Sequence, residues 1–338
     1  MINSFELKNF GPIQQFACPR ASHINIIIGG NGTGKTIFLK ALYTAMRTIE
    51  DYKRGNEPRS ASAILSEKLY WTFEVDKIGD LVQKGADGPL SLQLTFKGNS
   101  FSYEFGKDTT RTINYLINQV SPRESNSIFL PPKEIFSLQP LILQSREQNK
   151  TFGFDDTYLD LARALRQAKT RGGDYAEFYQ SRKSLKDIIS GHIEYDKSSQ
   201  NWQFKKGNQK FSIGVTSEGI KKISIIDTLL ENRYLDTDSI IFIDEIEGAL
   251  HPTAISKFLD IVVMLAEKGI QFFMASHSYF VIKKLFLIAQ KNYDISISIF
   301  SASEKKWNTG NLKEGLPDNP IIDESIRLYQ EEVRLALE

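Results

Sequence analysis

Alternating apolar and polar residues mark the N-terminal part of the chain as mainly β-structure around one helix. Phe5 and Leu7 alternate with polar residues, and residues 24–28 form an apolar run, so both segments are predicted strands. After Lys35, apolar residues recur at spacings of three and four, which predicts an amphipathic helix. From about Leu69 the period becomes two, which predicts antiparallel strands and hairpins. The apolar positions with this period are Leu69, Trp71, Phe73, Val75, Leu90, Leu92, Leu94, Phe96, Phe101, Tyr103 and Phe105.

The middle of the chain has the pattern of a short helical arm. Apolar positions at helical spacing between 157 and 190 predict two helices, joined at the glycine-containing residues 171–173. A polar hairpin follows, in which Trp202 and Phe204 precede the turn and Phe211 comes after it. The sustained heptad repeat of a long coiled coil is not present here.

Strand and helix patterns alternate in the last third. Apolar strands are predicted at 240–243, 271–275 and 295–299, and amphipathic helices separate them. Fully apolar strands in strand–helix–strand order are typical of a parallel sheet covered on both faces. A charged helix is predicted near residues 322–337. The fold class expected from these patterns is therefore α/β.

Composition excludes several classes of protein. The net charge of +1 over 338 residues gives no overall attraction to nucleic acid, so any basic surface must be local. A single cysteine, Cys18, forms neither an internal disulfide nor a zinc site, and it fits a reducing cytoplasm. No apolar run approaches 18 residues, so we expect no contact with a membrane.

A glycine-rich loop follows the strand at 24–28. Residues 29–36 match the phosphate-loop pattern G-x-x-x-x-G-K-[ST] in full, with a strand before it and a helix after it. Small residues let backbone N–H groups converge on phosphate oxygens, and the helix directs its positive end to the same place. Lys35 would bind the β- and γ-phosphates, and Thr36 would bind Mg²⁺. The expected nucleotide-binding residues are Gly29, Gly30, Asn31, Gly32, Thr33, Gly34, Lys35, Thr36 and Ile37.

Two acids and a histidine follow later apolar strands. Asp244 and Glu245 end the strand at 240–243, where Asp244 would hold Mg²⁺ and Glu245 would deprotonate the attacking water. Glu247 is the alternative base if Glu245 is not. His277 ends the next strand, where a side chain would reach the terminal phosphate of ATP. The expected catalytic residues are thus Lys35, Glu245 and His277.

The order of these motifs resembles the ABC-type ATPase heads of the SMC, RecF and OLD-nuclease group, many of which are described as AAA-family ATPases. The resemblance covers residues 1–46 with the phosphate loop, 240–252 with the Walker B strand and D-loop, and 276–278 with the switch histidine. Residues 216–221 look like the serine–glycine signature, in which Ser217 and Gly219 would contact ATP. From the residues alone, Ser217 is also a simple helix cap.

The resemblance implies a P-loop ATPase head with a mixed N-terminal β lobe, a parallel core sheet and a short helical arm. We expect residues 1–338 to form one head, with a Walker A lobe at 1–150, an arm and hairpin at 151–212, and a signature, Walker B and switch-histidine lobe at 213–338. In the family, the signature of one subunit reaches the ATP of the other, so a homodimer or higher homo-oligomer is implied. A Q-loop glutamine is missing after residue 130, which leaves residues 133–134 or Gln139 as its equivalent.

Two functions follow from the resemblance. The first is a head that dimerises on ATP and regulates a separately encoded effector, plausibly in anti-phage defence. The alternative is a RecF-like DNA-binding repair ATPase. Residues 157–222 hold 13 lysines and arginines against 7 aspartates and glutamates, interleaved with hairpin aromatics, which favours DNA. A solvated arm with ordinary hairpin aromatics explains the same residues.

Overall fold

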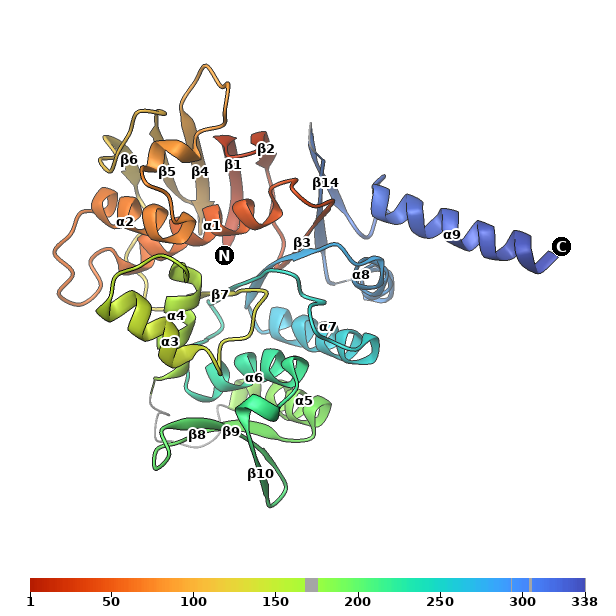
Figure 1. Cartoon of the computed structure of the whole chain (residues 1–338). Helices are drawn as coiled ribbons and strands as arrows, with labels where there is room; N and C mark the ends of the chain where they lie inside the picture. Colours follow the sequence, from red (N-terminus) through yellow and green to blue (C-terminus); the bar gives the residue numbers. More distant parts are fainter. Residues whose placement is uncertain (168–175, 293, 304–305, 338) are drawn as a thin grey trace.

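The computed structural model describes residues 1–167, 176–292, 294–303 and 306–337. Strands and helices follow one another as predicted for an α/β chain (Figure 1). The first half contains β1 (Ile2–Phe10), β2 (Ile13–Cys18), β3 (Ile24–Gly29), α1 (Lys35–Asp51), α2 (Ala61–Phe73), η1 (Ile78–Leu81), β4 (Leu90–Phe96), β5 (Asn99–Phe105), β6 (Tyr115–Asn118), β7 (Ser127–Leu130), α3 (Gln139–Leu143), η2 (Gln144–Gln148) and α4 (Asp156–Leu165). The second half contains η3 (Ala176–Phe178), α5 (Tyr179–Ile189), β8 (His192–Asp196), β9 (Asn201–Lys206), β10 (Gln209–Ser212), η4 (Ile213–Val215), α6 (Glu218–Glu231), β11 (Ile240–Ile243), α7 (Pro252–Glu267), β12 (Gln271–Ser276), α8 (Tyr279–Lys291), β13 (Ile297–Ala302), β14 (Trp307–Asn311) and α9 (Pro320–Leu337).

A six-stranded sheet within the described residues forms the centre of the molecule, in the order β14-β13-β3-β12-β11-β7. The strands from β13 to β7 pair in parallel, and β14 is antiparallel to β13 at one edge. Every residue of β3, β11 and β12 is buried, as a sheet covered on both faces requires. The predicted parallel sheet is thus confirmed. Its carboxyl edge, where β3, β11 and β12 end, is where α/β proteins bind ligands.

A second sheet packs against the first through α1. It is antiparallel, in the order β2-β1-β4-β5-β6, and it confirms the hairpin predicted at 90–105. Apolar side chains from this sheet, from α1 and from the core sheet share one hydrophobic cluster, in which Phe5, Phe38 and Phe300 contact one another. The helix that follows the phosphate loop is therefore enclosed between two sheets, which fixes its position.

The prediction for residues 69–75 was wrong, because they are not a strand. Residues 61–73 form α2, whose N-terminal cap is the Ser60 hydroxyl. The apolar residues at every second position face different sides of this helix: Leu69 is buried, whereas Trp71 lies under the guanidinium of Arg146 at 4.0 Å. The buried Ile64, Leu65 and Leu69 follow the helical spacing of three and four that decides the structure.

In Figure 1, helix α5 and the strands β8, β9 and β10 lie below the core sheet, whereas α4 lies to its left, beside β7. Helices α4 and α5 confirm the predicted pair, whereas the junction predicted at 171–173 lies outside the described residues. The hairpin has a third strand, β8, which the sequence pattern did not reveal. Trp202 and Phe204 are only 6% and 5% exposed, and Trp202 packs edge-on against Phe136. These two hairpin aromatics therefore belong to the core, whereas Phe211, the third, is 38% exposed.

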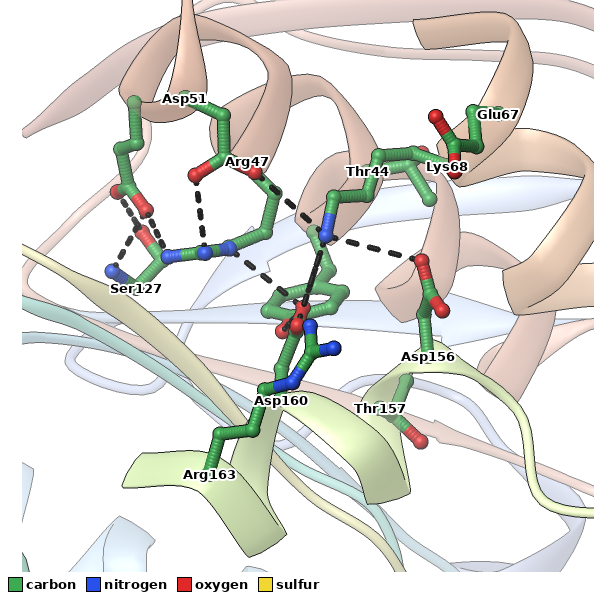
Figure 2. A network of polar contacts seen from close by, with 12 residues as sticks. Thr44, Arg47, Asp51, Glu67, Lys68, Ser127, Asp156, Thr157, Asp160 and Arg163 are labelled. Atoms are coloured by element: carbon green, nitrogen blue, oxygen red, sulfur yellow. Dashed lines mark hydrogen bonds and ion pairs between the residues drawn. The ribbon is translucent and has the colours of Figure 1, made fainter. Parts of the chain in front are cut away.

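An ion network joins α1 to the arm. Figure 2 shows Arg47 of α1, Lys68 of α2 and Asp160 of α4 pointing toward one another. Asp160 accepts a hydrogen bond from Tyr43 at 2.8 Å and lies 3.2 Å from the Lys68 ammonium and 3.6 Å from Arg47. Closer to the phosphate loop, Lys40 of α1 pairs with the Asp155 cap of α4 at 2.6 Å. These contacts hold the phosphate-loop helix and the first arm helix together.

The chain ends in α9, which projects away from the rest of the molecule (Figure 1). Several of its apolar side chains are exposed, namely Ile326, Leu328, Tyr329, Val333, Leu335 and Leu337. Across the part of the chain that the structure describes, no helix combines the length and apolar character needed to cross a bilayer.

Candidate functional site

The glycine loop connects the buried strand β3 to the start of α1. Gly34 caps α1 with a φ of 95°, a left-handed conformation that side chains other than glycine adopt at a cost. A Cβ at this position would also lie 2.8 Å from Cγ of Pro12. The loop thus turns tightly into the helix, and the first backbone N–H groups of α1 are left for an anion.

Lys35 lies over the loop that it follows. Its ammonium donates hydrogen bonds to the carbonyl oxygens of Gly29 at 2.8 Å and Gly30 at 2.7 Å. Burial lowers the pKa of Lys35, whereas Asp244 and the glutamates after it act in the opposite direction. The lysine side chain therefore lies at the point where the sequence predicts the phosphates.

Thr36 and Asp244 come together from elements far apart in the sequence. The Thr36 hydroxyl at the start of α1 donates to the Asp244 carboxylate after β11, at 2.8 Å. Asp244 is 4% exposed, and this burial raises its pKa while the hydrogen bond from Thr36 opposes the rise. A hydroxyl beside a carboxylate offers the oxygen ligands that Mg²⁺ prefers. The two residues therefore fit the predicted metal site, to which bound phosphates would add further oxygens.

No additional protein metal site is found in the described residues. Nowhere among them do three or more histidine, cysteine, aspartate or glutamate side chains gather closely enough to hold an ion.

Glu245 occupies a turn of unusual geometry. Its φ of 49° is left-handed, and its side chain is exposed, unlike that of Asp244 before it. The carbonyl oxygen of Glu245 accepts hydrogen bonds from the Gly248 amide at 2.8 Å and from the Lys222 ammonium. The turn thus directs the two consecutive carboxylates differently, with Asp244 toward Thr36 and Glu245 into an open cavity.

That cavity has a volume of about 240 Å³ and brings together many of the predicted residues, whereas Gly29, Gly30 and Thr33 are not among the residues that line it. Its lining comes from the glycine loop, the turn after β11 and the end of β12: Asn31, Gly32, Gly34, Lys35, Thr36, Ile37, Asp244, Glu245, Ala275, Ser276 and His277. Residues from three separate parts of the chain therefore meet at the carboxyl edge of the parallel sheet.

His277 is held by Glu247. One oxygen of the Glu247 carboxylate accepts the backbone N–H of His277 at 2.8 Å and lies 3.2 Å from its Nδ1. The imidazole itself is 52% exposed, so it is free to contact a ligand in the cavity. Sequence reasoning considered Glu247 only as an alternative base and missed this contact. Its position two residues after Glu245, on the turn next to the end of β12, could have suggested a contact with His277.

Ser217 and Gly219 lie elsewhere. Among the described residues that line the nucleotide cavity, none comes from this segment. Ser217 is exposed and caps α6, with its Oγ 3.5 Å from the Ile220 amide. A Cβ on Gly219 would lie 2.7 Å from the carbonyl oxygen of Ala249, so α6 begins in close contact with the D-loop segment.

Gln139 does not reach the nucleotide cavity. It is 3% exposed, donates to the Ala162 carbonyl at 2.7 Å and accepts the indole N–H of Trp202 at 2.8 Å. Its amide is therefore engaged within the arm. Lys133 and Glu134 line a different cavity, of about 340 Å³, together with Lys222 and Ala249.

Three comparisons place this geometry among known proteins. Residues 24–283 match the family described as "AAA domain, putative AbiEii toxin, Type IV TA system". A protein of Helicobacter pylori (strain ATCC 700392 / 26695) named ATP/GTP phosphatase is 22% identical over 320 residues, which span 82% of this chain and 85% of that protein.

The fold is similar to that of SMC heads. An SMC head bound to the C-terminal winged-helix domain of ScpA aligns with a TM-score of 0.53 and 13% identity, over 92% of this chain and 97% of that one. An SMC head with an extended coiled coil, bound to the C-terminal domain of ScpA derived from Pyrococcus furiosus, aligns with a TM-score of 0.50 and 12% identity, over 98% and 99% of the two chains. The predicted fold class is thus confirmed.

The family match covers the phosphate loop, the Walker B strand and the switch histidine. It confirms the predicted relationship to ATPase heads, and the SMC-like fold agrees with it. The chain belongs to this AAA family of ATPases.

Proposed function

We propose that the chain binds ATP with Mg²⁺ at residues 29–37 and hydrolyses it to ADP and phosphate in a composite site between two heads. One observation carries the proposal: Lys35, Thr36, Asp244, Glu245 and His277 line a single cavity, although they come from three distant segments. This is the combination of phosphate-binding, metal-binding and proton-accepting groups that phosphoryl transfer to water requires.

Each group has a separate part in the reaction. The amides of the glycine loop and the Lys35 ammonium bind the phosphates, while Thr36 and Asp244 would hold Mg²⁺. When bound, the ion neutralises charge on the phosphate oxygens. Glu245 accepts a proton from the water that attacks the γ-phosphorus, as the bond from that phosphorus to ADP breaks. His277 contacts the transferred phosphoryl group, held in place by Glu247.

A second copy of the chain completes the site. Ser217 is exposed at the N-terminus of α6, outside the nucleotide cavity of its own chain. An exposed helix N-terminus with a hydroxyl is suited to an anion supplied from outside. Two heads that face each other would place each Ser217 and Gly219 against the γ-phosphate bound by the partner. Dimerisation would thus depend on ATP.

The head would act on a separately encoded effector in the cytoplasm, plausibly in anti-phage defence. In this proposal the chain is one head with three parts: the Walker A lobe (1–150), the arm and hairpin (151–212), and the signature and Walker B lobe (213–338). The family description names a toxin system, and the two similar SMC heads are bound to another protein. A head that changes its dimerisation with ATP is suited to switching such a partner.

A RecF-like DNA clamp has less support. The basic excess in residues 157–222 remains, but Trp202 and Phe204 are buried and cannot stack on bases or sugars. Lys210 lies 3.3 Å from Glu194, so this lysine of the hairpin is already paired with an acid. ATP turnover that rises with duplex DNA and falls steeply with salt would favour this alternative.

The Glu245→Gln variant tests the proposal. It should keep ATP bound and slow hydrolysis at least about a hundredfold, the lower scale for loss of a positioned base. Because ATP then persists, sedimentation velocity with Mg-ATP should show a stable dimer, and ADP should show a monomer. Unchanged turnover would exclude Glu245 as the base. A variant that holds ATP but stays monomeric would exclude the two-head site.

A further inference from the structure

Lys222 lies where α6, which begins within the signature residues 216–221 and is called the signature helix below, contacts the turn at Glu245. It belongs to the first turns of α6, five residues after Ser217, and only 6% of it is exposed. Its ammonium donates a hydrogen bond to the backbone carbonyl of Glu245, the oxygen that also accepts the Gly248 amide. One buried cation thus connects α6 to the peptide group that carries the predicted general base.

The environment keeps this ammonium in place. Burial lowers the pKa of Lys222 to about 8, whereas the nearby carboxylates of Glu247, Glu245 and Asp244 act to raise it. A Cβ on Gly248 would lie only 3.2 Å from the Lys222 Nζ, so the space around it is filled. A buried charge is costly unless it is partnered, so the contact with Glu245 is a stabilising one.

The contact acts on a backbone that is itself unusual. Glu245 has a φ of 49°, and a left-handed conformation outside glycine persists when its surroundings determine it. The Glu245 carbonyl is fixed by Lys222 and Gly248, while Asp244 donates its amide to Leu130 at 3.0 Å and Ile246 donates to Ala275 at 3.2 Å. Of these contacts, the one from Lys222 is made by a side chain of the signature helix.

We propose that Lys222 is a positioning residue that links the signature helix of a head to the general base of the same head. This inference rests on the proposed two-head site. In that two-head site, α6 of one head contacts the ATP bound by the other head. A shift of α6 on dimerisation would therefore move Lys222, and through it the Glu245 peptide of the same head. Each composite site would then influence the other, and the two sites would turn over cooperatively.

The test is steady-state and binding analysis of Lys222→Met, with Lys222→Arg as the conservative variant. Lys222→Met should lower kcat about 10- to 100-fold, since small misplacement of a reacting group costs this much. The Kd for ATP should stay within about twofold, because Lys222 does not line the nucleotide cavity. The dependence of turnover on ATP should lose its cooperativity, and Lys222→Arg should recover part of kcat.

Lys284→Met serves as the control. Lys284 is a partly buried lysine on α8 that pairs with Asp260 at 2.7 Å, away from the nucleotide cavity. Its loss should leave kcat and the Kd for ATP near wild type. Folding of each variant is checked by its thermal midpoint. If Lys222→Met does not fold, Lys222→Gln replaces it, since it removes the charge at the same position and leaves the residues of the Glu245 turn unchanged.

A folded Lys222→Met protein with kcat within about twofold of wild type would overturn the inference. So would a loss confined to ATP affinity, because a positioning role must affect kcat. The two proposals fail separately. If wild-type protein hydrolyses ATP as a monomer, the two-head site is wrong. The kcat of Lys222→Met then still reports whether the lysine positions Glu245.

Discussion

The Glu247 carboxylate contacts both the backbone amide and the imidazole of His277. These contacts help to decide whether Glu247 acts as the general base or positions the histidine. A general base must have an oxygen free to take a proton from water. Glu247 uses one oxygen on His277, and its other oxygen is buried. Glu245, by contrast, has an exposed side chain in the nucleotide cavity. We therefore propose Glu245 as the base and a positioning role toward His277 for Glu247.

His277→Ala and Glu247→Gln should separate these roles. His277→Ala should lower kcat more than ATP affinity, because the imidazole acts where charge develops in the reaction. Glu247→Gln keeps an oxygen that accepts the His277 amide, so its loss of kcat should be well below the hundredfold expected for Glu245→Gln. Steady-state kinetics and calorimetry of the three variants measure this. An equal loss from Glu247→Gln and Glu245→Gln would contradict the assignment.

Lys35→Ala should abolish tight ATP binding. In the proposed site the ammonium would make charge-assisted contacts with the phosphates, each contributing about 1.5–3 kcal/mol. Isothermal calorimetry with ATP gives the affinity directly, and Lys284→Ala controls for the loss of a lysine away from the cavity. ATP affinity equal to that of wild type would show that the loop does not hold the phosphates.

At the scale of elements, the contact between α1 and α4 is mainly ionic. Asp160 is 5% exposed on its side chain and is surrounded by Tyr43, Arg47 and Lys68 (Figure 2). Burial alone would raise its pKa, but the Lys68 and Arg47 cations prevail and lower it to about 2. A carboxyl with a lowered pKa stabilises the fold above its ordinary pKa, and this contribution disappears as the pH falls toward 2.

Asp160→Asn should destabilise the protein by about 3–5 kcal/mol at pH 7, because it leaves buried cations without their partner. Denaturant unfolding gives the free energy of unfolding, and the difference from wild type should shrink as the pH falls from 5 toward 2. Glu147→Gln is the control, since it removes a half-exposed pair with Arg163 that contributes about 0.2–1 kcal/mol. Equal losses for the two variants would contradict the network.

The spacing of apolar residues predicted the elements that bury either one face or all of their side chains. It failed for an element that carries apolar side chains on several sides. Strands β3, β11 and β12 are apolar throughout, so the parallel sheet could be read from the sequence. Helix α2 has apolar residues on several sides, because Trp71 stacks with Arg146, and this produced a false period of two. The glycine loop and the turn after β11 could be predicted because their residue types are required by the chemistry of phosphate.

Contacts that join distant segments could not be predicted. Gln139 was one candidate for the Q-loop glutamine, yet its amide forms hydrogen bonds with Ala162 and Trp202 within the arm. Lys222 gave no sequence signal, because its partner is a backbone carbonyl rather than an acid. Neither residue belongs to a short motif, so only the packed chain reveals its partner.

At the scale of the whole molecule, the proposed assembly requires each chain to supply halves of two different composite sites. The cavity with Lys35, Thr36 and Asp244 is at the carboxyl edge of the core sheet, whereas Ser217 is exposed outside it. If hydrolysis needs both halves, it needs two molecules. The central claim is therefore about assembly, and it is tested best by variants that damage opposite halves.

The most direct measurement is ATP turnover by a mixture of Ser217→Arg and Lys35→Ala. Each variant alone should be inactive: Ser217→Arg because the arginine blocks the contact with the partner's ATP, and Lys35→Ala because it does not hold ATP. In a mixed dimer, the phosphate loop of the Ser217→Arg chain meets the intact signature of the Lys35→Ala chain. We predict partial recovery of turnover on mixing. Normal turnover by Ser217→Arg alone, from a protein that remains monomeric with ATP, would contradict the account.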